Sequence, residues 1–207
     1  MPQRPAQGHR ESFRERRERL AAIDDPDVVL NAAARFLQVR SRSVDEVRRH
    51  LTQAGYRAEL VEQAVSRLME LGMLDDGAFA RMWVESRDRA RPRSEIALRR
   101  ELALKGIDRE LAAQVLDERR GGGSGEARGD TETAGGERPD PDNAAADRLL
   151  RKHARTLERV AEPRERRQRA YALLARNGFD PDVCREAIAR FLASAAADDE
   201  SPAVDGE

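Results

Sequence analysis

Residues 48–65 read RRHLTQAGYRAELVEQAV, and the same design returns as RRELALKGIDRELAAQVL at 99–116 and as YALLARNGFDPDVCREAI at 171–188. In each copy a leucine stands four residues before a glycine, a large apolar residue follows the glycine, and later apolar positions have helical spacing. Such self-similarity is typical of repeat proteins, in which each unit buries its apolar face partly against its neighbours. We therefore predict an all-α chain of three tandem three-helix repeats in an elongated, curved array, with its function on a surface rather than in a catalytic pocket.

The composition favours helices in a soluble protein. Charged residues make up 37% of the 207 residues and aromatic residues only 4%, which is typical of salt-bridged helices rather than of a β-sandwich or barrel. No apolar run approaches the ~18 residues of a membrane span, and the N-terminus lacks the apolar segment of a secretion signal. The single cysteine, Cys184, cannot form an internal disulfide, and its apolar neighbours predict a core position. We expect a cytoplasmic protein that does not bind membranes.

Helix start signals divide the chain. Asp25-Pro26 supplies an N-cap and a first-turn proline, and Ser43 with Glu46 forms a capping box. Gly121 to Pro141 is rich in Gly, Ser, Thr, Glu and Pro, so it buries too little apolar surface to offset its ordering entropy. The predicted parts are a disordered basic arm at 1–24, the first repeat at 25–73, the second at 74–119, a flexible Gly-rich linker at 120–141, the third repeat at 142–194, and a disordered acidic tail at 195–207.

The net charge of −1 hides a local excess of arginine. The segment from Arg148 to Arg176 holds ten cations against three acids. Arginine keeps its charge and binds phosphates and carboxylates with two parallel hydrogen bonds. A charged helical face is often only solvated, but an excess of one sign also suits contact with an anionic surface, so both interpretations stay open. The scarcity of aromatic residues argues against a protein that reads single strands by stacking, and Trp83 has the helical spacing of a core residue.

Motifs for catalysis are weak. Adjacent Asp75 and Asp76 could form a metal site or an acid/base pair, but acids at a helix start more simply cap its free N–H groups. The three histidines lack partners at metal-ligand spacing, and no Lys-Ser/Thr follows Gly121-Gly122-Gly123, as a phosphate-binding loop requires. We predict a non-enzyme with no cofactor and no metal.

The chain resembles a known family at its most specific motifs. The runs LGMLDDGAFARMWVESR at 71–87 and RRELALKGIDRE at 99–110 resemble the central signature of the RecX regulatory proteins, and LLARNGFDPDVCREAIARFL at 173–192 resembles their C-terminal repeat. The similarity covers about residues 28–118 and 143–193. The positions that carry the signature, which we expect to be structural, are Asp75, Asp76, Phe79, Ala80, Lys105, Gly106 and Ile107.

The resemblance implies a fold and a partner. Members of the family consist of tandem three-helix repeats that bind RecA, lie in the groove of the RecA–DNA filament and suppress its ATPase, strand-exchange and coprotease activities. This chain departs from the pattern at Ser94, where many members have glycine, and in its linker, which is longer than the usual junction between the second and third repeats. The longer linker gives no support to a rigid placement of the third repeat against the second.

The resemblance thus predicts a monomeric regulator that binds RecA and the RecA–DNA filament in recombination and the SOS response, with weak direct binding to DNA. Corresponding places in the middle helices carry arginines, which we predict to contact the filament or DNA: Arg48, Arg49, Arg99, Arg100, Arg166, Arg167 and Arg169. Two alternatives stay open, a helical DNA-binding protein that acts independently of RecA and a small enzyme that uses Asp75 and Asp76.

Overall fold

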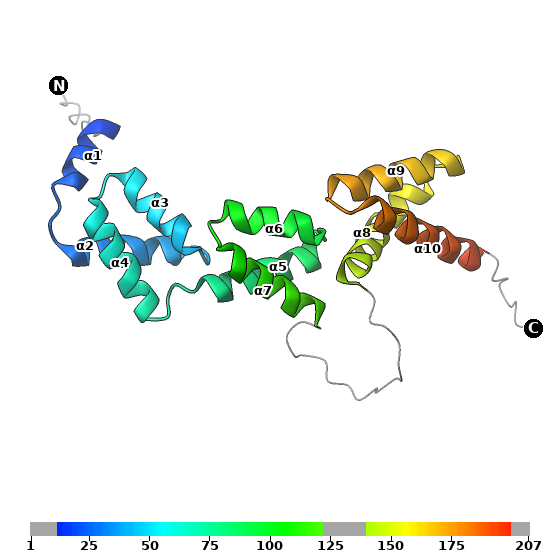
Figure 1. Ribbon diagram of the computed structural model, residues 1–207. Coiled ribbons are helices and arrows are strands. Elements are labelled where there is room, and N and C mark those ends of the chain that lie inside the picture. Colours follow the sequence, from blue (N-terminus) through cyan, green and yellow to red (C-terminus); the bar gives the residue numbers. More distant parts are fainter. Residues whose placement is uncertain (1–11, 122–139, 200–207) are drawn as a thin grey trace, which may run out of the picture. The chain divides into compact units, whose positions relative to one another are not determined.

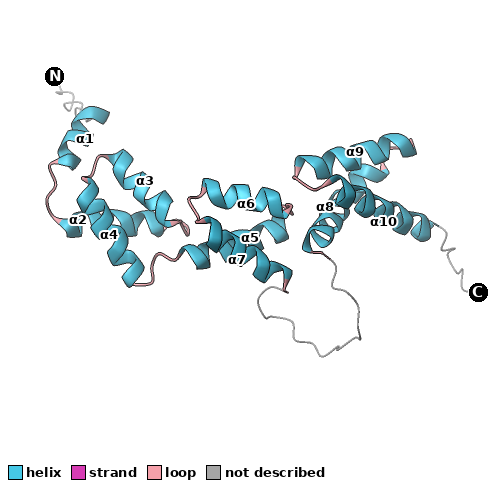
Figure 2. Ribbon diagram, viewed as in Figure 1, coloured by secondary structure: helices cyan, strands magenta, loops and turns pink. Residues whose placement is uncertain are grey.

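The computed structural model describes residues 12–121 and 140–199, and within these ranges it contains ten α-helices and no strand (Figures 1 and 2). The all-α class with tandem three-helix repeats is therefore confirmed. The chain forms two compact units, 1–79 and 80–207. The helices are α1 (Phe13–Ala21), α2 (Pro26–Leu37), α3 (Val44–Ala54), α4 (Ala58–Glu70), α5 (Asp76–Ala90), α6 (Glu95–Leu104), α7 (Arg109–Arg120), α8 (Pro141–Glu158), α9 (Pro163–Arg176) and α10 (Pro181–Asp199).

The first unit is built on the three-helix core of α2, α3 and α4. The Ser43 hydroxyl accepts the Glu46 N–H at 3.1 Å, and the Glu46 carboxylate accepts the Ser43 N–H at 3.4 Å, which is the predicted capping box. Gly55 ends α3 in the left-handed region, with φ 113°. The core of this unit is aliphatic and includes Val29, Ala33, Val47, Leu51, Leu60, Val61, Ala64, Val65, Leu68 and Leu74.

The prediction of a disordered arm at 1–24 is wrong for residues 13–21, which form α1. Ser12 and Glu15 make a second capping box, and Leu20 is buried at 6% exposure. Arg17 lies against Gly55, where a Cβ atom would come within 2.6 Å of the Arg17 side chain. Helix α1 is held by buried Leu20 and by the close approach of Arg17 to Gly55. Neither contact produces an apolar periodicity, so the sequence pattern did not reveal this helix. The rest of the predicted arm, residues 1–11, lies outside the described residues.

The boundary between the two units falls within α5, and the second unit contains the rest of α5 with α6 and α7, followed by the set α8 to α10. Proline stands at the first position of α8, α9 and α10, where its missing N–H costs no hydrogen bond. The core of the last set includes Ala145, Ala146, Leu149, Leu150, Leu157, Ala170, Leu174, Phe179, Cys184, Ala187 and Ile188. Cys184 is fully buried, as its apolar neighbours predict.

Two predicted boundaries differ from the structure. The acidic tail was expected to begin at residue 195, but α10 continues to Asp199, because the alanine-rich residues there are good helix formers and no stop signal interrupts them. The expected linker loses its ends to α7 and α8, and its remainder, 122–139, lies outside the described residues, as do 200–207. No helix in the described part of the chain is long and apolar enough to cross a bilayer.

Candidate functional site

The N-terminus of α8 caps the N-terminus of α6. Asp142, the second residue of α8, accepts the backbone N–H of Glu95 with its two carboxylate oxygens at 2.9 and 3.1 Å. Ser94, the N-cap residue of α6, accepts the Ala97 N–H at 3.2 Å. An acid of the third repeat therefore satisfies one of the free N–H groups at a helix start in the second. Burial raises the pKa of Asp142 above its ordinary value, although the Glu95 N–H and Arg119 act to lower it.

The same arrangement occurs in the first unit. Asp76 at the start of α5 accepts the backbone N–H of Val44 at 2.8 Å, and Val44 is the first residue of α3. Burial raises the pKa of Asp76 as well. Asp75 accepts the Ala78 N–H at 2.9 Å and so caps α5 itself. Both carboxylates are engaged by backbone donors, which favours the capping interpretation of this acidic pair over a catalytic one. Because Pro163 opens α9 and has no N–H, the third repeat offers no equivalent donor.

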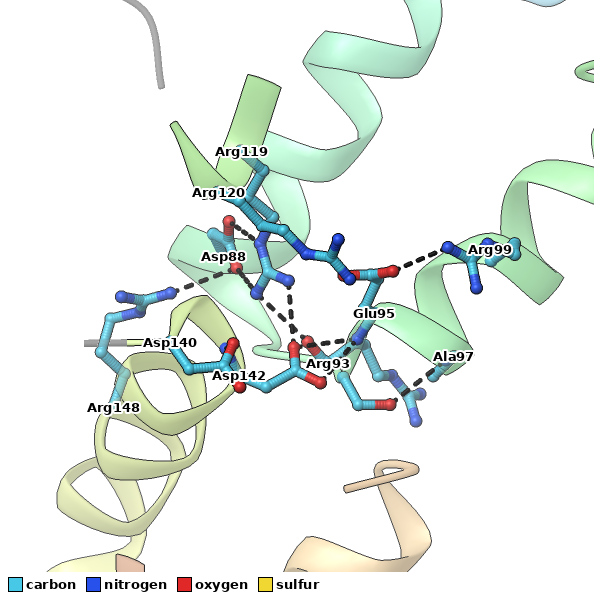
Figure 3. Close-up of polar contacts among 11 residues, drawn as sticks. Asp88, Arg93, Glu95, Ala97, Arg99, Arg119, Arg120, Asp140, Asp142 and Arg148 are labelled. Atoms are coloured by element: carbon cyan, nitrogen blue, oxygen red, sulfur yellow. Dashed lines mark hydrogen bonds and ion pairs between the residues drawn. The ribbon is translucent and has the colours of Figure 1, made fainter. Parts of the chain in front are cut away.

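Arg119 is the centre of an ion-pair network that joins α5, α7 and α8 (Figure 3). Its side chain is only 6% exposed. It donates to both carboxylate oxygens of Asp88 at 3.0 Å and to Asp142 at 3.1 Å. Arg148 of α8 reaches the same Asp88 at 3.2 Å. Despite the long linker, these pairs fix the start of the third repeat against the second, because a buried guanidinium needs its carboxylates in place.

The motif glycine of the third repeat is part of the same junction. Gly178 has φ +87°, and a Cβ atom there would lie 2.8 Å from the Ser94 hydroxyl oxygen and 2.9 Å from the Cβ of Ala97. The backbone N–H of Ser94 donates to the carbonyl of Asn177 at 3.3 Å. Gly178 therefore serves both a left-handed turn and a close approach between repeats.

Most of the predicted contact arginines are engaged within the protein. Short ion pairs join Arg48 to Glu62, Arg49 to Asp45, Arg99 to Glu95 and Arg169 to Glu165, at 2.6, 2.7, 2.7 and 2.6 Å respectively. The Arg166 guanidinium donates twice to the Val160 carbonyl, at 2.9 and 3.1 Å, and so holds the loop before α9. Arg100 and Arg167 are exposed and have no acidic partner among the described residues. Arg48 and Arg49 belong to the first unit, and the other five belong to the second.

Several arginines of the third repeat pair with no acid among the described residues, and sequence reasoning named only Arg167 of these as a contact candidate. Their only signal was the excess of cations over acids between Arg148 and Arg176. They are exposed residues of α8, of the loop after it and of α9, and the name unpaired arginine face stands below for this set of residues: Arg151, Arg155, Arg159, Arg164, Arg167 and Arg176. Their full charge is available to an external anion.

The signature residues have mostly internal roles. Phe79, Ala80 and Ile107 are buried, and Gly106 is left-handed with φ +77°. The Lys105 ammonium lies 4.8 Å from the ring centroid of Trp83, and the Arg87 guanidinium lies 4.3 Å from it. Trp83 is only half-buried, so the core position that its spacing predicts is not found, and its indole donates to Glu101 of the second repeat at 2.9 Å. No group of three or more His, Cys, Asp or Glu side chains that could hold a metal ion occurs in the described ranges.

Three family models match the chain. They are described as the first, second and third three-helix domains of RecX, and they match residues 30–68, 75–116 and 140–188. The resemblance drawn from the signature residues is therefore confirmed.

Curated relatives agree with the family models. A regulatory protein RecX of Prosthecochloris aestuarii is 37% identical over 45% of this chain, and the match spans 62% of that relative's length. One of Pelodictyon phaeoclathratiforme is 28% identical over 82% of this chain and 92% of its own length. One of Mycobacterium sp. strain JLS is 30% identical over 77% of this chain and 79% of its own.

Solved structures share the fold. The crystal structure of RecX from Lactobacillus salivarius superimposes with a TM-score of 0.56 at 17% identity, and it covers 82% of this chain and 98% of that one. A second crystal structure of a regulatory protein RecX has the same TM-score at 20% identity, over 76% of this chain and 68% of its own.

Proposed function

The chain belongs to the RecX family of regulatory proteins, and we propose that it binds the RecA–DNA filament and inhibits RecA. The activities concerned are ATP hydrolysis, strand exchange and coprotease function, in recombination and the SOS response. The protein acts in the cytoplasm as a monomer and has no catalytic activity of its own. Inhibition by capping filament growth, by destabilising the filament and by blocking its groove are all compatible with this proposal.

The observation that carries the proposal beyond family membership is the unpaired arginine face. A nucleoprotein filament presents phosphates and acidic side chains, and exposed guanidiniums without internal partners lose no ion pair when they bind them. Arginines already paired with an acid, such as Arg48 and Arg99, must exchange that partner first. We therefore assign the principal contact to the unpaired arginine face and a smaller share to Arg100. The paired arginines of the first two repeats remain candidates for secondary contacts.

Titration of the protein into a RecA ATPase assay on single-stranded DNA tests the proposal. We expect the rate of ATP hydrolysis to fall as the protein saturates the filament. An unchanged rate together with no binding to the filament would refute it.

An alternative is a DNA-binding protein that acts independently of RecA, and the unpaired arginine face is also compatible with it. That alternative predicts equal, strongly salt-dependent affinity for naked and RecA-coated DNA. Our proposal predicts tighter binding to the coated DNA.

A further inference from the structure

A groove of about 700 Å³ lies between α9 and α10 of the third repeat. Its apolar surface comes from Tyr171, Ile188 and Leu192, with Ala189 and Ala193 beside them. Tyr171 is 40% exposed, although it is a large aromatic side chain. Two guanidiniums, Arg167 from α9 and Arg185 from α10, also line the groove. The groove therefore combines an apolar floor with cations from both of its helices.

Each of the other two repeats has a cross-helix ion pair at one of two places that correspond to this groove. When the repeats are aligned on Gly55, Gly106 and Gly178, Tyr171 corresponds to Arg48 and Arg185 corresponds to Glu62. In the first repeat that arginine and that glutamate pair at 2.6 Å between α3 and α4. The predicted correspondence of the middle-helix arginines is therefore wrong for the third repeat, whose arginines stand earlier on the helix.

A second pair shows the same change. Leu192 corresponds to Arg120 and Arg167 to Glu95. In the second repeat those two residues pair at 2.6 Å between α7 and α6. The third repeat has arginine at the positions of these two acids, and Tyr171 and Leu192 at the positions of the two arginines.

This change removes the internal acids and leaves the cations without cross-helix partners. The Arg167 guanidinium and the Tyr171 hydroxyl have no hydrogen-bond partner among the described residues. Among the described residues Arg185 bonds only within its own helix, with the Asp182 carboxylate and the Pro181 carbonyl, and the Arg185 and Asp182 side chains are largely exposed. A ligand that completes the groove supplies anionic groups and apolar surface, and an acidic protein segment with an apolar side chain supplies both.

We propose that the α9–α10 groove docks an acidic, apolar segment of a protein partner. An apolar side chain of that segment packs between Tyr171 and Leu192, and its carboxylates pair with Arg167 and Arg185. A nucleic-acid backbone fits less well, because it would leave the apolar floor uncovered. This inference rests on the proposed function, since it places the segment on the RecA protein and not on DNA.

Two variants test the groove without disturbing the core. Ala189 is exposed on α10 and lines the groove, so Ala189→Glu places a carboxylate there. Glutamate is a good helix former, so this substitution should not disturb α10. Tyr171→Ala removes the exposed aromatic surface, and Tyr171→Phe is its matched control because it keeps the ring. Arg109→Glu is an exposed charge reversal on α7, outside the groove. Circular dichroism and thermal melting identify any variant that fails to fold.

Binding is measured by fluorescence anisotropy on labelled poly(dT), naked or coated with RecA and a slowly hydrolysed ATP analogue. We expect Ala189→Glu and Tyr171→Ala to weaken filament binding by roughly tenfold or more, with naked-DNA binding unchanged and both controls like wild type.

Filament binding by both groove variants at wild-type strength would overturn the inference while leaving the proposed function intact. Parallel loss on naked DNA would overturn it by assigning the groove to nucleic acid. Failure of the wild type itself to bind the filament would refute the proposed function, and the inference with it.

Discussion

Asp142 and Glu95 are joined across the junction between the second and third repeats, because the Asp142 carboxylate accepts the Glu95 backbone N–H at 2.9 and 3.1 Å. The equivalent pair in the first unit is Asp76 with the Val44 N–H at 2.8 Å. In both cases an acid at the start of one helix caps another helix whose own N-cap is a buried serine, Ser94 or Ser43. An acid at the start of one repeat therefore satisfies a free N–H group at a helix start in the preceding repeat.

Loss of the Asp142 oxygen should destabilise the second unit. We expect Asp142→Ala to lower the free energy of unfolding by about 2–4 kcal/mol, because it leaves the Glu95 N–H unpaired and removes one carboxylate from buried Arg119. Asp142→Asn keeps an acceptor for that N–H, and burial already disfavours the carboxylate, so we expect a loss of only about 1 kcal/mol. Urea denaturation followed by circular dichroism compares the two. Equal losses would contradict this account of the carboxylate.

Protonation of Asp142 should make the stability of the second unit depend on pH. Its pKa is raised by burial, so the native state binds this proton more readily than the unfolded state does. Wild type should therefore gain stability relative to Asp142→Asn as the pH falls through the raised pKa, and this gain should level off below the ordinary value of 3.8.

Glu62 provides a control of opposite sign. Its hydrogen bond to Arg48 lowers its pKa, so the advantage of wild type over Glu62→Gln should shrink as the pH falls through that lowered pKa. Denaturation midpoints of the wild type and the two variants at several pH values test both directions. A wild-type advantage over Asp142→Asn that also shrinks with acid would contradict the role of burial.

The two glycines Gly178 and Gly72 should respond differently to alanine. Both have positive φ, but a Cβ at Gly178 meets Ser94 and Ala97 below 3.0 Å, whereas a Cβ at Gly72 meets nothing within 4 Å. Gly72→Ala should cost about 1 kcal/mol from backbone strain alone. Gly178→Ala should cost about 2–4 kcal/mol, because steric overlap at the junction is added to that strain. Thermal unfolding of the two variants compares them, and similar losses would mean that the junction relaxes easily around residue 178.

The sequence predicts local features of this fold well and long-range ones poorly. The capping box at Ser43 and the left-handed turns at Gly55 and Gly178 depend on residues a few positions apart, so their patterns are visible in one stretch of chain. The contact of Asp142 with Glu95 joins residues 47 positions apart, and no periodic pattern in the sequence predicts it.

The same distinction applies to the candidate site. The excess of arginine in the third repeat is visible in the composition, but which arginines are paired is decided by the packing of helices. Arg48 is paired with Glu62, which lies on another helix and 14 residues away in the sequence. The Arg166 guanidinium donates to the Val160 carbonyl in the loop before α9. Its neighbour Arg167 has no acidic partner among the described residues.

Substitution of Arg166 should therefore affect mainly stability, and substitution of Arg167 should affect mainly binding. The Arg166 guanidinium donates twice to the Val160 carbonyl, so Arg166→Ala should lower the free energy of unfolding by about 1–2 kcal/mol. Arg167→Ala should leave stability within about 0.5 kcal/mol of wild type and weaken binding to the RecA filament. Denaturation and filament titration of both single variants measure the two effects. If Arg167→Ala destabilised the protein as much as Arg166→Ala, Arg167 would have an internal role.

The unpaired arginine face should contribute more to filament binding than paired arginines do. We expect the double variant Arg151→Gln, Arg155→Gln to lose about 1–3 kcal/mol of binding free energy, as is typical of lost hydrogen bonds to charged groups. The control Arg48→Gln, Arg49→Gln removes the same charge from arginines already held by Glu62 and Asp45, so it should lose less. The difference between the two double variants should shrink as salt is raised, because screening also weakens the wild-type attraction. Anisotropy titrations on RecA-coated poly(dT) at several salt concentrations measure both, and equal losses at low salt would show that internal pairing does not decide which arginines meet the filament.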